Sequence, residues 1–356
     1  MADGVRKDEE FSGTKEVEER HRINEASLDG WMREHVEGYQ GPLTVLQFKG
    51  GQSNPTYKLE TPARSYVMRR KPFGKLLPSA HAVDREYRLL SALHPLGFPV
   101  PRPLALCDDP EVIGSIFYIM ELARGRPYAN GALPEFDPPT RQRIYAQLVD
   151  TLADLHSIDP EAAELGDFGK PGNYFERQVM RWTRQYRDSQ TDYIAEVERL
   201  IAFLPETLPE QSRTSIVHGD YRIDNVVFDG DGTLTAVLDW ELATLGDPLA
   251  DFSYLAMQWV MPADGGAGLA GLDLAALGIP AIDEIAQRYS ARSGVPVAEK
   301  LDWYFAYNLF RLTGIVQGIK KRVIDGTASH AEAAEMAKRV PTLASAAWNF
   351  AVKAGA

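Results

Sequence analysis

The most informative stretch of this chain is Ile216-Val217-His218-Gly219-Asp220-Tyr221-Arg222-Ile223-Asp224-Asn225-Val226-Val227-Phe228, which continues after a short gap as Ala236-Val237-Leu238-Asp239-Trp240-Glu241. Its three apolar runs, at residues 216–217, 226–228 and 236–238, predict short buried strands. The intervening turn sequence Asp-Gly-Asp-Gly predicts that the second and third strands pair as a hairpin. Such a hairpin places Asn225 beside Asp239, with Asp220 on the loop leading in. Two carboxylates and an amide then converge at one sheet edge, and oxygen ligands of this kind suit magnesium held through phosphates.

The spacing of these polar residues adds a second indication. Asp220 and Asn225 are five positions apart, as in the kinase catalytic loop, where the Asp accepts the proton of the substrate hydroxyl and the Asn holds a metal ion. Asp239 stands where the second metal-binding residue of that arrangement would be. The alternative is a polar β-turn with solvated acids. Apolar runs flank all three residues, however, and buried carboxylates need a cation or a donor, so the sequence favours the metal–phosphate interpretation.

These motifs resemble the aminoglycoside-phosphotransferase-type, protein-kinase-like family. The pattern His218-Gly219-Asp220 followed by Asn225 resembles the family's catalytic loop. Other sequence motifs, distributed over much of the chain, resemble one branch of the family in particular. That branch consists of the kinase-like domains fused to, or encoded near, acyl-CoA dehydrogenases. The segments that carry the closer resemblance are residues 50–56, 76–81, 84–87, 218–222 and 238–251.

Composition limits the class of protein. The chain has 356 residues, which is too long for most single cores and predicts two lobes. A net charge of −12 makes nucleic-acid binding an improbable main role. Cys107 is the single cysteine, and the first 25 residues hold no apolar signal segment. The most apolar long segment, residues 303–319, is interrupted by polar side chains and predicts a buried helix rather than a membrane span. We therefore expect a cytoplasmic protein with no membrane or nucleic-acid partner.

The first lobe is predicted over residues 27–122, after a flexible arm at 1–26. A helix at 27–37 would be capped by Ser27, with Asp29 as the rival cap. Strands at 43–48 and 56–59 flank a glycine turn. Backbone amides in such a turn can lie over phosphates; the candidates are Gly50, Gly51 and Ser53. The turn is not a Walker A loop, because no Gly-Lys-Ser/Thr and no helix follow it.

The third strand and the helix after it predict an ion pair. Alternation along residues 66–69 places Val67 and Arg69 on one face, although Arg69 could instead belong to a basic surface cluster with the next two residues. In the helix at 83–93, Glu86 shares an apolar stripe with three aliphatic residues. A buried glutamate without a partner would cost roughly 3–5 kcal/mol. Arg69 is the natural cation, and this reproduces the strand-cation and helix-glutamate pair of kinases.

A buried strand at residues 116–122 runs into a Gly/Pro-containing loop, which is where the first lobe should end. The resemblance implies that this is a hinge where Met120 and backbone groups of Glu121 to Ala123 contact adenine; the residues themselves predict only an edge strand. The second lobe, residues 123–356, is predicted to be mainly helical. On its helix at 174–187, Arg177, Arg181 and Arg184 form a basic stripe. That stripe could dock an anionic substrate such as a CoA nucleotide, or could equally be a solvated face.

The resemblance implies an α+β, protein-kinase-like bilobal fold with ATP and Mg²⁺ between the lobes. The γ-phosphoryl group of ATP would pass to a hydroxyl of a small molecule, with Asp220 as the catalytic acceptor of the hydroxyl proton. Asn225 and Asp239 would hold the metal. Arg69, held by Glu86, would contact the α- and β-phosphates, and Val67 would roof the nucleotide. His218, Asp247 and Asp251 are predicted to brace the loops rather than to react.

The acceptor is less well specified than the reaction. The branch resemblance implies a hydroxyacyl-CoA, whose phosphorylated hydroxyl becomes a leaving group, and a separate acyl-CoA dehydrogenase as a partner enzyme. The first alternative is a kinase for an aminoglycoside, an amino-alcohol or a sugar, which would need an acidic pocket if its substrate were cationic. The second alternative is a nucleotide-binding pseudokinase. The intact Asp220, Asn225 and Asp239 argue against it, and the missing strand lysine argues for it.

Overall fold

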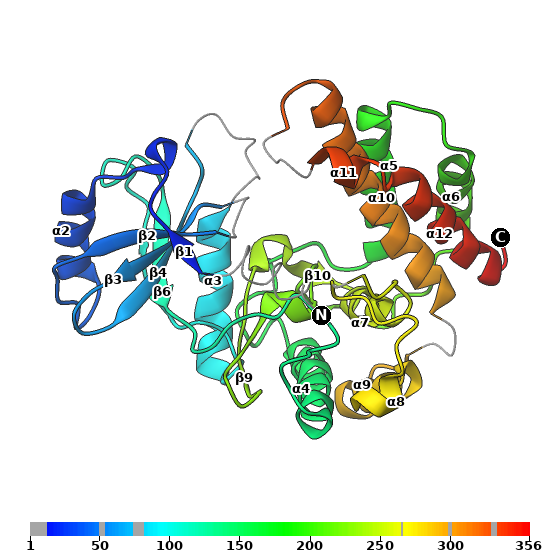
Figure 1. Ribbon diagram of the computed structural model, residues 1–356, viewed down its shortest axis with the longest axis horizontal. Helices are drawn as coiled ribbons and strands as arrows, with labels where there is room; N and C mark the ends of the chain where they lie inside the picture. Colours follow the sequence, from blue (N-terminus) through cyan, green and yellow to red (C-terminus); the bar gives the residue numbers. More distant parts are fainter. Residues whose placement is uncertain (1–12, 50–53, 74–81, 265, 298–300, 329–332) are drawn as a thin grey trace.

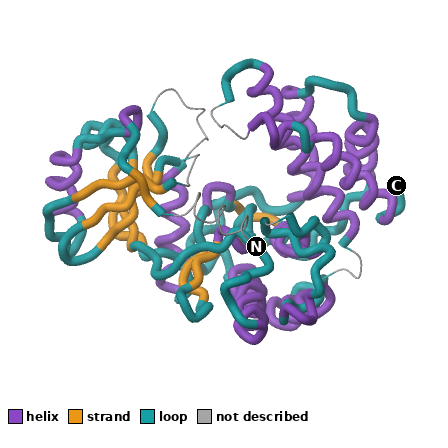
Figure 2. Tube along the Cα trace, viewed as in Figure 1, coloured by secondary structure: helices purple, strands orange, loops and turns teal. Residues whose placement is uncertain are grey.

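The computed structural model describes residues 13–49, 54–73, 82–264, 266–297, 301–328 and 333–356. One part of the molecule is an antiparallel sheet with helices on both faces, and the other is mainly helical (Figures 1 and 2). The two parts are joined by the chain that leaves the sheet after Glu121. This is the α+β arrangement of two lobes that the sequence predicted.

The sheet is antiparallel throughout. Its strands lie in the order β1-β2-β3-β4-β6-β5. The register pairs Arg69 with Thr56 on one side and with Tyr118 on the other, so Arg69 lies on a central strand. The bounds are β1 Thr14–Lys15, β2 Thr44–Phe48, β3 Thr56–Glu60, β4 Ser65–Arg70, β5 Pro103–Cys107 and β6 Phe117–Glu121.

The two faces of the sheet bury different cores, because side chains alternate along each strand. Met68 and Ile119 pack in a cluster with Leu28 and Met32 of helix α2 (Glu25–His35). Val67 and Met120, together with Leu90 of α3 (Val83–Leu93), belong instead to the large cluster that continues into the helical lobe. The alternation predicted for Val67 therefore holds, and that side chain faces the junction of the lobes.

The N-terminal region is more ordered than the sequence predicted. Within the expected flexible arm, β1 pairs with β2, and a 3-10 helix, η1 (Glu19–His21), follows it. The backbone carbonyl of His21 accepts a hydrogen bond of 2.8 Å from the Tyr57 hydroxyl. The prediction that Ser27 or Asp29 caps the next helix is wrong. Asn24 is the cap, and its side-chain oxygen accepts a hydrogen bond of 3.1 Å from the Ser27 amide.

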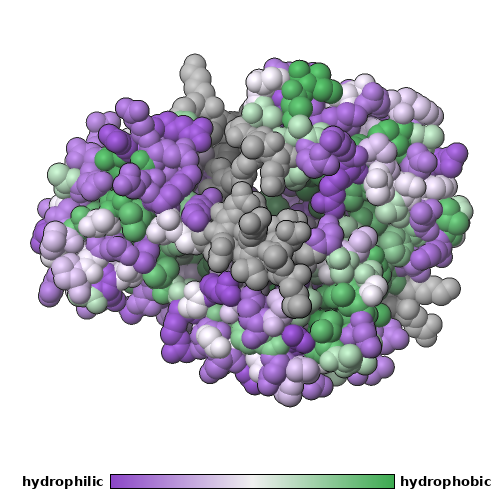
Figure 3. All heavy atoms as spheres, viewed as in Figure 1, coloured by the Kyte–Doolittle hydropathy of each residue, from purple (hydrophilic) through white to green (hydrophobic). Residues whose placement is uncertain are grey.

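The second lobe is built around α10, which packs against α5, α7 and α12. Its central residues are buried all round, including the polar Asn308, Arg311 and Gln317, as the sequence predicted for residues 303–319. No helix in the described part of the chain is long and apolar enough to cross a membrane. On the face drawn in Figure 3, hydrophilic residues dominate over the sheet lobe and hydrophobic residues gather in separate areas of the helical lobe. The helices are α4 Pro138–Ser157, α5 Tyr174–Ser189, α6 Ala195–Glu206, α7 Leu249–Ala256, α8 Leu274–Leu277, α9 Ile282–Ser293, α10 Asp302–Ile324, α11 Ala333–Ala337 and α12 Val340–Lys353.

Two small strand pairs support the loops between the lobes. The predicted hairpin is confirmed: β8 (Val226–Phe228) pairs with β9 (Leu234–Val237), with Val226 opposite Val237. A second pair joins β7 (Ser215–Val217) to β10 (Thr244–Gly246). Short 3-10 helices punctuate the connections: η2 His94–Leu96, η3 Ile223–Asn225, η4 Trp240–Leu242 and η5 Met257–Trp259.

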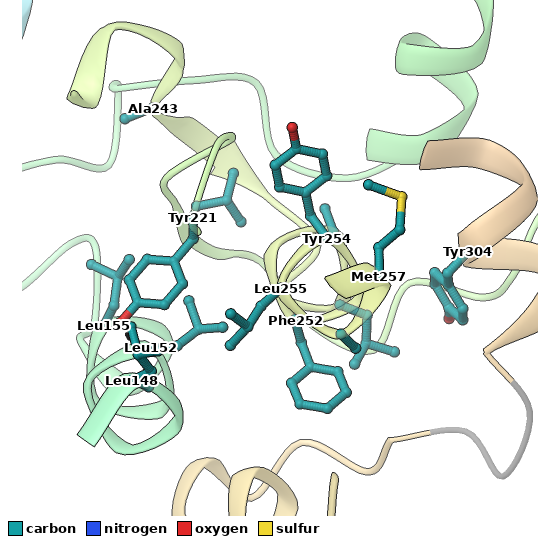
Figure 4. Close-up of a cluster of buried hydrophobic side chains, with 14 of the residues drawn as sticks. Leu148, Leu152, Leu155, Tyr221, Ala243, Phe252, Tyr254, Leu255, Met257 and Tyr304 are labelled. Atoms are coloured by element: carbon teal, nitrogen blue, oxygen red, sulfur yellow. Dashed lines mark hydrogen bonds between the residues drawn. The ribbon is translucent and has the colours of Figure 1, made fainter. Parts of the chain in front are cut away.

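A buried aromatic residue fixes this region to the helical core. Tyr221 points away from the loop toward α4, where its hydroxyl donates a hydrogen bond of 2.9 Å to the carbonyl of Leu148 (Figure 4). Phe252 and Leu255 of α7 belong to the same cluster of buried side chains (Figure 4). The loop that carries Asp220 therefore rests on a packed base, so its polar side chains are held in place.

Candidate active site

The loop after β7 begins with a backbone turn that requires glycine. Gly219 has φ +83°, and a Cβ placed there would lie 2.8 Å from the carbonyl oxygen of Leu242. The carbonyl of Gly219 accepts a hydrogen bond of 2.7 Å from Nη2 of Arg311. A left-handed backbone and close packing together explain the small residue between His218 and Asp220.

Asp220 and Asn225 are in direct contact, as their spacing predicted. Nδ2 of Asn225 donates to Oδ2 and to the backbone carbonyl of Asp220, each over 2.9 Å. Because both hydrogens of this amide point toward Asp220, its carbonyl oxygen faces the other way and can serve as a ligand. The contact holds one carboxylate oxygen of Asp220 and leaves the other for a substrate proton.

Asp239 lies beside this pair, at the end of β9. The amide of Leu238 donates to the carbonyl of Asn225 over 2.8 Å, which fixes the two residues side by side. Asp239 itself has φ +65°, a strained backbone for a residue with a Cβ. The side chain of Asp239 is 40% exposed to solvent, and its Oδ1 lies 3.3 Å from Nη2 of Arg69. The three polar residues predicted to converge do so.

The oxygen atoms at this edge fit a magnesium ion bound through phosphates. One amide oxygen and one half-exposed carboxylate are hard ligands, and Mg²⁺ is usually bound by one or two such groups with substrate phosphates completing its shell. No cluster of three or more His, Cys, Asp or Glu side chains that could hold a metal occurs within the described residues. Asn225 and Asp239 would therefore hold the ion only together with a phosphate ligand.

The predicted ion pair between β4 and α3 is confirmed. Nη1 of Arg69 lies 2.7 Å from Oε1 of Glu86, and both side chains are more than 90% buried. Burial opposes the charge on Arg69, but Glu86, together with Tyr118, Asp239 and Glu241, outweighs that effect and holds the pKa of Arg69 above its ordinary value. Burial raises the pKa of Glu86, and Arg69 counteracts part of the rise. The pair aims one arm of the guanidinium at Asp239, where phosphates would lie.

The neighbouring arginine has a different role. The side chain of Arg70 is fully buried, and its Nε donates to the hydroxyl of Tyr57 over 3.0 Å. It therefore belongs to the far face of the sheet, and the alternative of a basic surface cluster does not hold. Arg69 is the arginine that lies on the face predicted for phosphates.

At the hinge, one backbone group of the predicted segment is already paired within the sheet. The amide of Glu121 donates to the carbonyl of Arg102 over 2.9 Å, so it does not face a nucleotide. The candidates for adenine are then the carbonyl of Glu121 and the amide of Ala123. Met120 is buried in the same hydrophobic cluster as Val67.

The glycine turn between β2 and β3 lies outside the described residues, and with it the predicted phosphate contacts of Gly50, Gly51 and Ser53. The first described residue after the turn is Asn54, which is buried. Its Nδ2 lies 3.4 Å from Oε2 of Glu241, two residues beyond Asp239. Asn54 therefore contacts the loop that carries the candidate metal ligand.

His218 braces the loop, as predicted. The amide of Asp220 donates to Nδ1 of His218 over 3.1 Å, so Nδ1 is an acceptor and the proton is on Nε2. Nε2 in turn donates to the carbonyl of Leu238 over 2.8 Å. Both ring nitrogens are used in holding the Asp220 loop against the Asp239 loop, which excludes His218 as the base in this arrangement.

A buried carboxylate on α7 supports the same loop from below. Asp251 accepts hydrogen bonds from the amides of His218, over 2.5 Å, and Gly219, over 2.8 Å. Burial alone would raise the pKa of Asp251, but hydrogen bonds and charge from His156 and His218 hold it below the ordinary value. Asp247, just before α7, is also buried. Its Oδ1 accepts a hydrogen bond of 2.8 Å from the amide of Leu249, and burial raises the pKa of Asp247 to about 6. Asp251 braces the Asp220 loop as the sequence predicted, whereas the hydrogen bond of Asp247 stays within the start of α7.

Asp251→Ala is expected to destabilise the protein by about 3–5 kcal/mol, because it leaves two buried amides and His156 without their acceptor. Urea unfolding at pH 7 measures the loss. The pKa of Asp251 is lowered on folding, so its contribution is present at neutral pH and disappears as the pH falls through the folded value. Asp283→Ala, an exposed carboxylate on α9, is the control and should change stability by less than about 1 kcal/mol. Equal stability of the two variants would contradict the brace.

Three further residues surround Asp220 that the sequence did not single out. Arg311 lies with its guanidinium carbon 5.0 Å from the ring centre of Tyr254. Burial raises the pKa of Asp220, and the charges of Arg222 and Arg311 offset part of the rise. A buried arginine within an apolar helix was the signal for Arg311, since such a charge needs a partner. Two arginines therefore act on the carboxylate of Asp220, and one of them, Arg222, is also paired with Asp224.

The basic stripe predicted on α5 is not one surface. Arg177 bends back toward the start of its own helix, where Nη1 contacts the carbonyl of Gly172 and Nη2 donates to that of Lys170 over 2.7 Å. Its guanidinium is engaged in holding the loop before the helix. Arg181 and Arg184 are exposed and lie farther along.

Residues 44–287 of this chain match the family described as "Phosphotransferase enzyme family". Mouse acyl-CoA dehydrogenase family member 10 is 42% identical over 96% of this chain, which covers 32% of that protein. Human acyl-CoA dehydrogenase family member 11 is 35% identical over 94% of the chain, which covers 44% of that protein. The chain thus spans about a third to less than half of the length of these relatives.

Solved structures give the same answer. A Ralstonia eutropha protein named as an aminoglycoside phosphotransferase has a TM-score of 0.85 at 46% identity, with 93% of this chain and 99% of that chain covered. The aminoglycoside phosphotransferase APH(4)-Ia, solved with AMP-PNP and hygromycin B, has a TM-score of 0.58 at 19% identity, covering 93% and 99%, and supports the fold alone. The predicted kinase-like bilobal fold is confirmed, and the chain belongs to the phosphotransferase enzyme family.

Proposed function

We propose that this chain transfers the γ-phosphoryl group of ATP to the hydroxyl of a hydroxyacyl-CoA. The observation that carries the reaction type is the contact between Asn225 and Asp220, with Asp239 fixed beside them by the Leu238–Asn225 hydrogen bond. This arrangement offers a proton acceptor and metal ligands at one edge, which is what phosphoryl transfer to a hydroxyl requires. The family assignment supports the same chemistry.

In the proposed step, the acceptor oxygen forms a bond to the γ-phosphorus while the bond from that phosphorus to the β–γ bridging oxygen breaks. ADP leaves with the bridging oxygen. The hydroxyl proton passes to the free oxygen of Asp220 and from there to solvent. Catalysis is then mainly positioning and charge stabilisation, which suits a carboxylate held by Asn225 on a braced loop.

The nucleotide would lie between the lobes. Arg69, oriented by Glu86, would contact its phosphates, and Val67 and Met120 would line its base. Magnesium held by Asn225 and Asp239 would neutralise charge on the β- and γ-phosphates. The structure of the ion pair supports this role for Arg69, because the guanidinium is fixed on the cleft side and reaches Asp239.

The acceptor is proposed from the relatives. The curated relatives named acyl-CoA dehydrogenase family member 10 and 11 are 34% to 42% identical over 93% to 96% of this chain, whereas hygromycin-B 4-O-kinase is 23% identical over 60% of it. Phosphorylation would turn the hydroxyl of an acyl-CoA into a leaving group, and an acyl-CoA dehydrogenase would then act in the same sequence of reactions.

The test is release of ADP from magnesium-ATP with a panel of hydroxyacyl-CoAs, free hydroxy acids, amino-alcohols and aminoglycosides. We expect turnover with a hydroxyacyl-CoA and none with its deoxy analogue. Turnover only with a cationic amine would reject the acceptor and keep the reaction. Nucleotide binding with no turnover on any acceptor would favour the pseudokinase alternative.

In a plot of kcat/KM against pH, the midpoint of the acid limb should lie above the ordinary aspartate pKa of 3.8. The reason is that burial raises the pKa of Asp220 and only its ionised form accepts a proton. Activity is therefore expected to rise with pH through this pKa. Arg222→Gln should move the limb to higher pH, since the charge of Arg222 lowers the pKa of Asp220. Arg288→Gln, which breaks a pair with Asp150 on α4, should leave the limb in place. A limb that moves to lower pH in Arg222→Gln would contradict the assignment.

A further inference from the structure

A basic groove lies between α5 and α10, which run side by side in the helical lobe (Figure 1). It has a volume of about 450 Å³ and is open to solvent. Its cationic residues come from both helices, Arg181 and Arg184 from α5 and Lys321 and Arg322 from α10. Arg181 and Arg184 are three positions apart and share one face of α5, whereas Lys321 and Arg322 are consecutive residues of α10. The groove is therefore formed by helix packing and not by one run of charge.

The charges in this groove are poorly compensated. Asp188 is the acid among the residues that line it, and Lys321 is paired with Asp325 over 2.7 Å. Within the described ranges, the guanidinium groups of Arg181, Arg184 and Arg322 form no ion pair with a carboxylate. The whole chain carries a net charge of −12, so a concentration of unpaired arginines in a hollow is a local exception.

Unpaired guanidinium groups in a hollow suit a phosphate ligand. A guanidinium presents two parallel N–H donors to the oxygens of a phosphate, and such charge-assisted hydrogen bonds are about twice as strong as neutral ones. The guanidinium carbon of Arg181 lies 5.4 Å from the ring centre of Trp182, which limits its freedom. A solvated basic face would need neither the concave shape nor the convergence of two helices.

The groove is connected to the candidate active site along α10. Arg311 on this helix donates to the carbonyl of Gly219, next to Asp220. Lys321 is ten residues farther along the same helix, which corresponds to about 15 Å at the rise of an α-helix. One elongated molecule could therefore place a hydroxyl at Asp220 and a phosphorylated end in the groove.

We infer that this groove binds the phosphate groups of the nucleotide end of the acceptor thioester. The inference rests on the proposed function for the identity of the acceptor, and it assigns Arg184 and Arg322 to recognition of that end. The residues make no contact with the reacting atoms. Their removal should weaken acceptor binding and leave the binding of ATP unchanged.

The test is calorimetric binding of free CoA to the full chain in the presence of saturating AMP-PNP, which keeps the adenosine of CoA out of the ATP site. Wild type is compared with Arg184→Ala/Arg322→Ala. We expect the dissociation constant for CoA to rise about tenfold for each arginine lost, or about 100-fold in the double variant. Arg292→Ala on α9 removes the same charge from an exposed ion pair and should change the constant less than about threefold.

Two further probes separate the sources of the phosphate. Pantetheine, which lacks the nucleotide, should bind equally to wild type and to the double variant. Inorganic phosphate should displace CoA only at concentrations far above the dissociation constant of CoA. CoA binding that is equal in all variants would overturn the inference. Tight binding of inorganic phosphate in the groove, together with CoA binding that does not change when the arginines are replaced, would also overturn the inference. The groove would then be a separate anion site.

The binding measurement does not depend on turnover, so the two proposals can fail separately. Loss of CoA binding in the double variant, together with no phosphoryl transfer to any hydroxyacyl-CoA, would keep the groove and reject the reaction. Turnover of a hydroxyacyl-CoA with an unchanged KM in the double variant would keep the reaction and reject the groove.

Discussion

Asp239→Ala is expected to lower turnover by about 1000-fold or more, because it removes the one carboxylate proposed to hold magnesium at the phosphates. The loss should be visible as ADP release with the best acceptor. Nucleotide binding should also lose its dependence on magnesium, since Asn225 alone is a neutral ligand. The variant tests position as well as charge, because the strained backbone of Asp239 places the carboxylate next to Arg69.

Asp231→Ala is the matched control for this experiment. Asp231 lies at the exposed turn of the same β8–β9 hairpin, where its Oδ1 accepts a hydrogen bond of 2.7 Å from the hydroxyl of Thr233. Its removal should cost little activity. Near-wild-type turnover in Asp239→Ala, or equal losses in the two variants, would contradict the metal assignment.

Asp220→Asn is expected to lower kcat by about 100- to 10,000-fold while the affinities for ATP and acceptor stay within a few-fold of wild type. The amide oxygen of an asparagine can still accept the hydrogen bond from Nδ2 of Asn225, so the loop should keep its geometry. The amide cannot take the hydroxyl proton. Burst and steady-state measurements of phosphoryl transfer, combined with nucleotide titration, separate the two effects.

Two outcomes would count against Asp220 as the proton acceptor. An unchanged kcat would show that the hydroxyl needs no base at this position. Loss of nucleotide affinity together with kcat would show that the carboxylate acts in binding. Thermal unfolding of the variant should match wild type, because the replaced atoms are nearly the same in size.

The local motifs carried most of the correct predictions. The hairpin that joins Asn225 to Asp239 follows from a glycine turn between two apolar runs. The pair of Arg69 and Glu86 follows from alternation in a strand and from a charged residue on an apolar helix stripe. In the second case a charged residue stands where the helix pattern demands an apolar one, and its burial requires a specific partner.

The features that the sequence did not show depend on which partners a side chain or backbone group finds in the folded chain. The groove joins α5 to α10, and Lys321 and Arg322 come near Arg184 only through the packing of those helices. The side chain of Arg177 does not lie on one surface with Arg181 and Arg184, because its guanidinium binds carbonyls in the loop just before its own helix. The amide of Glu121 was taken by a neighbouring strand, and a spacing pattern cannot reveal such competition.

The central claim is that the γ-phosphate of ATP moves to a hydroxyl of a CoA thioester on this chain. The most direct measurement follows radioactive phosphorus from γ-labelled ATP into products, with a hydroxyacyl-CoA as acceptor and Asp220→Asn as control. The account predicts label on the acceptor, at its hydroxyl, and none with the variant. Label that appears only as inorganic phosphate, or that never leaves ATP with any hydroxyacyl-CoA, would contradict it.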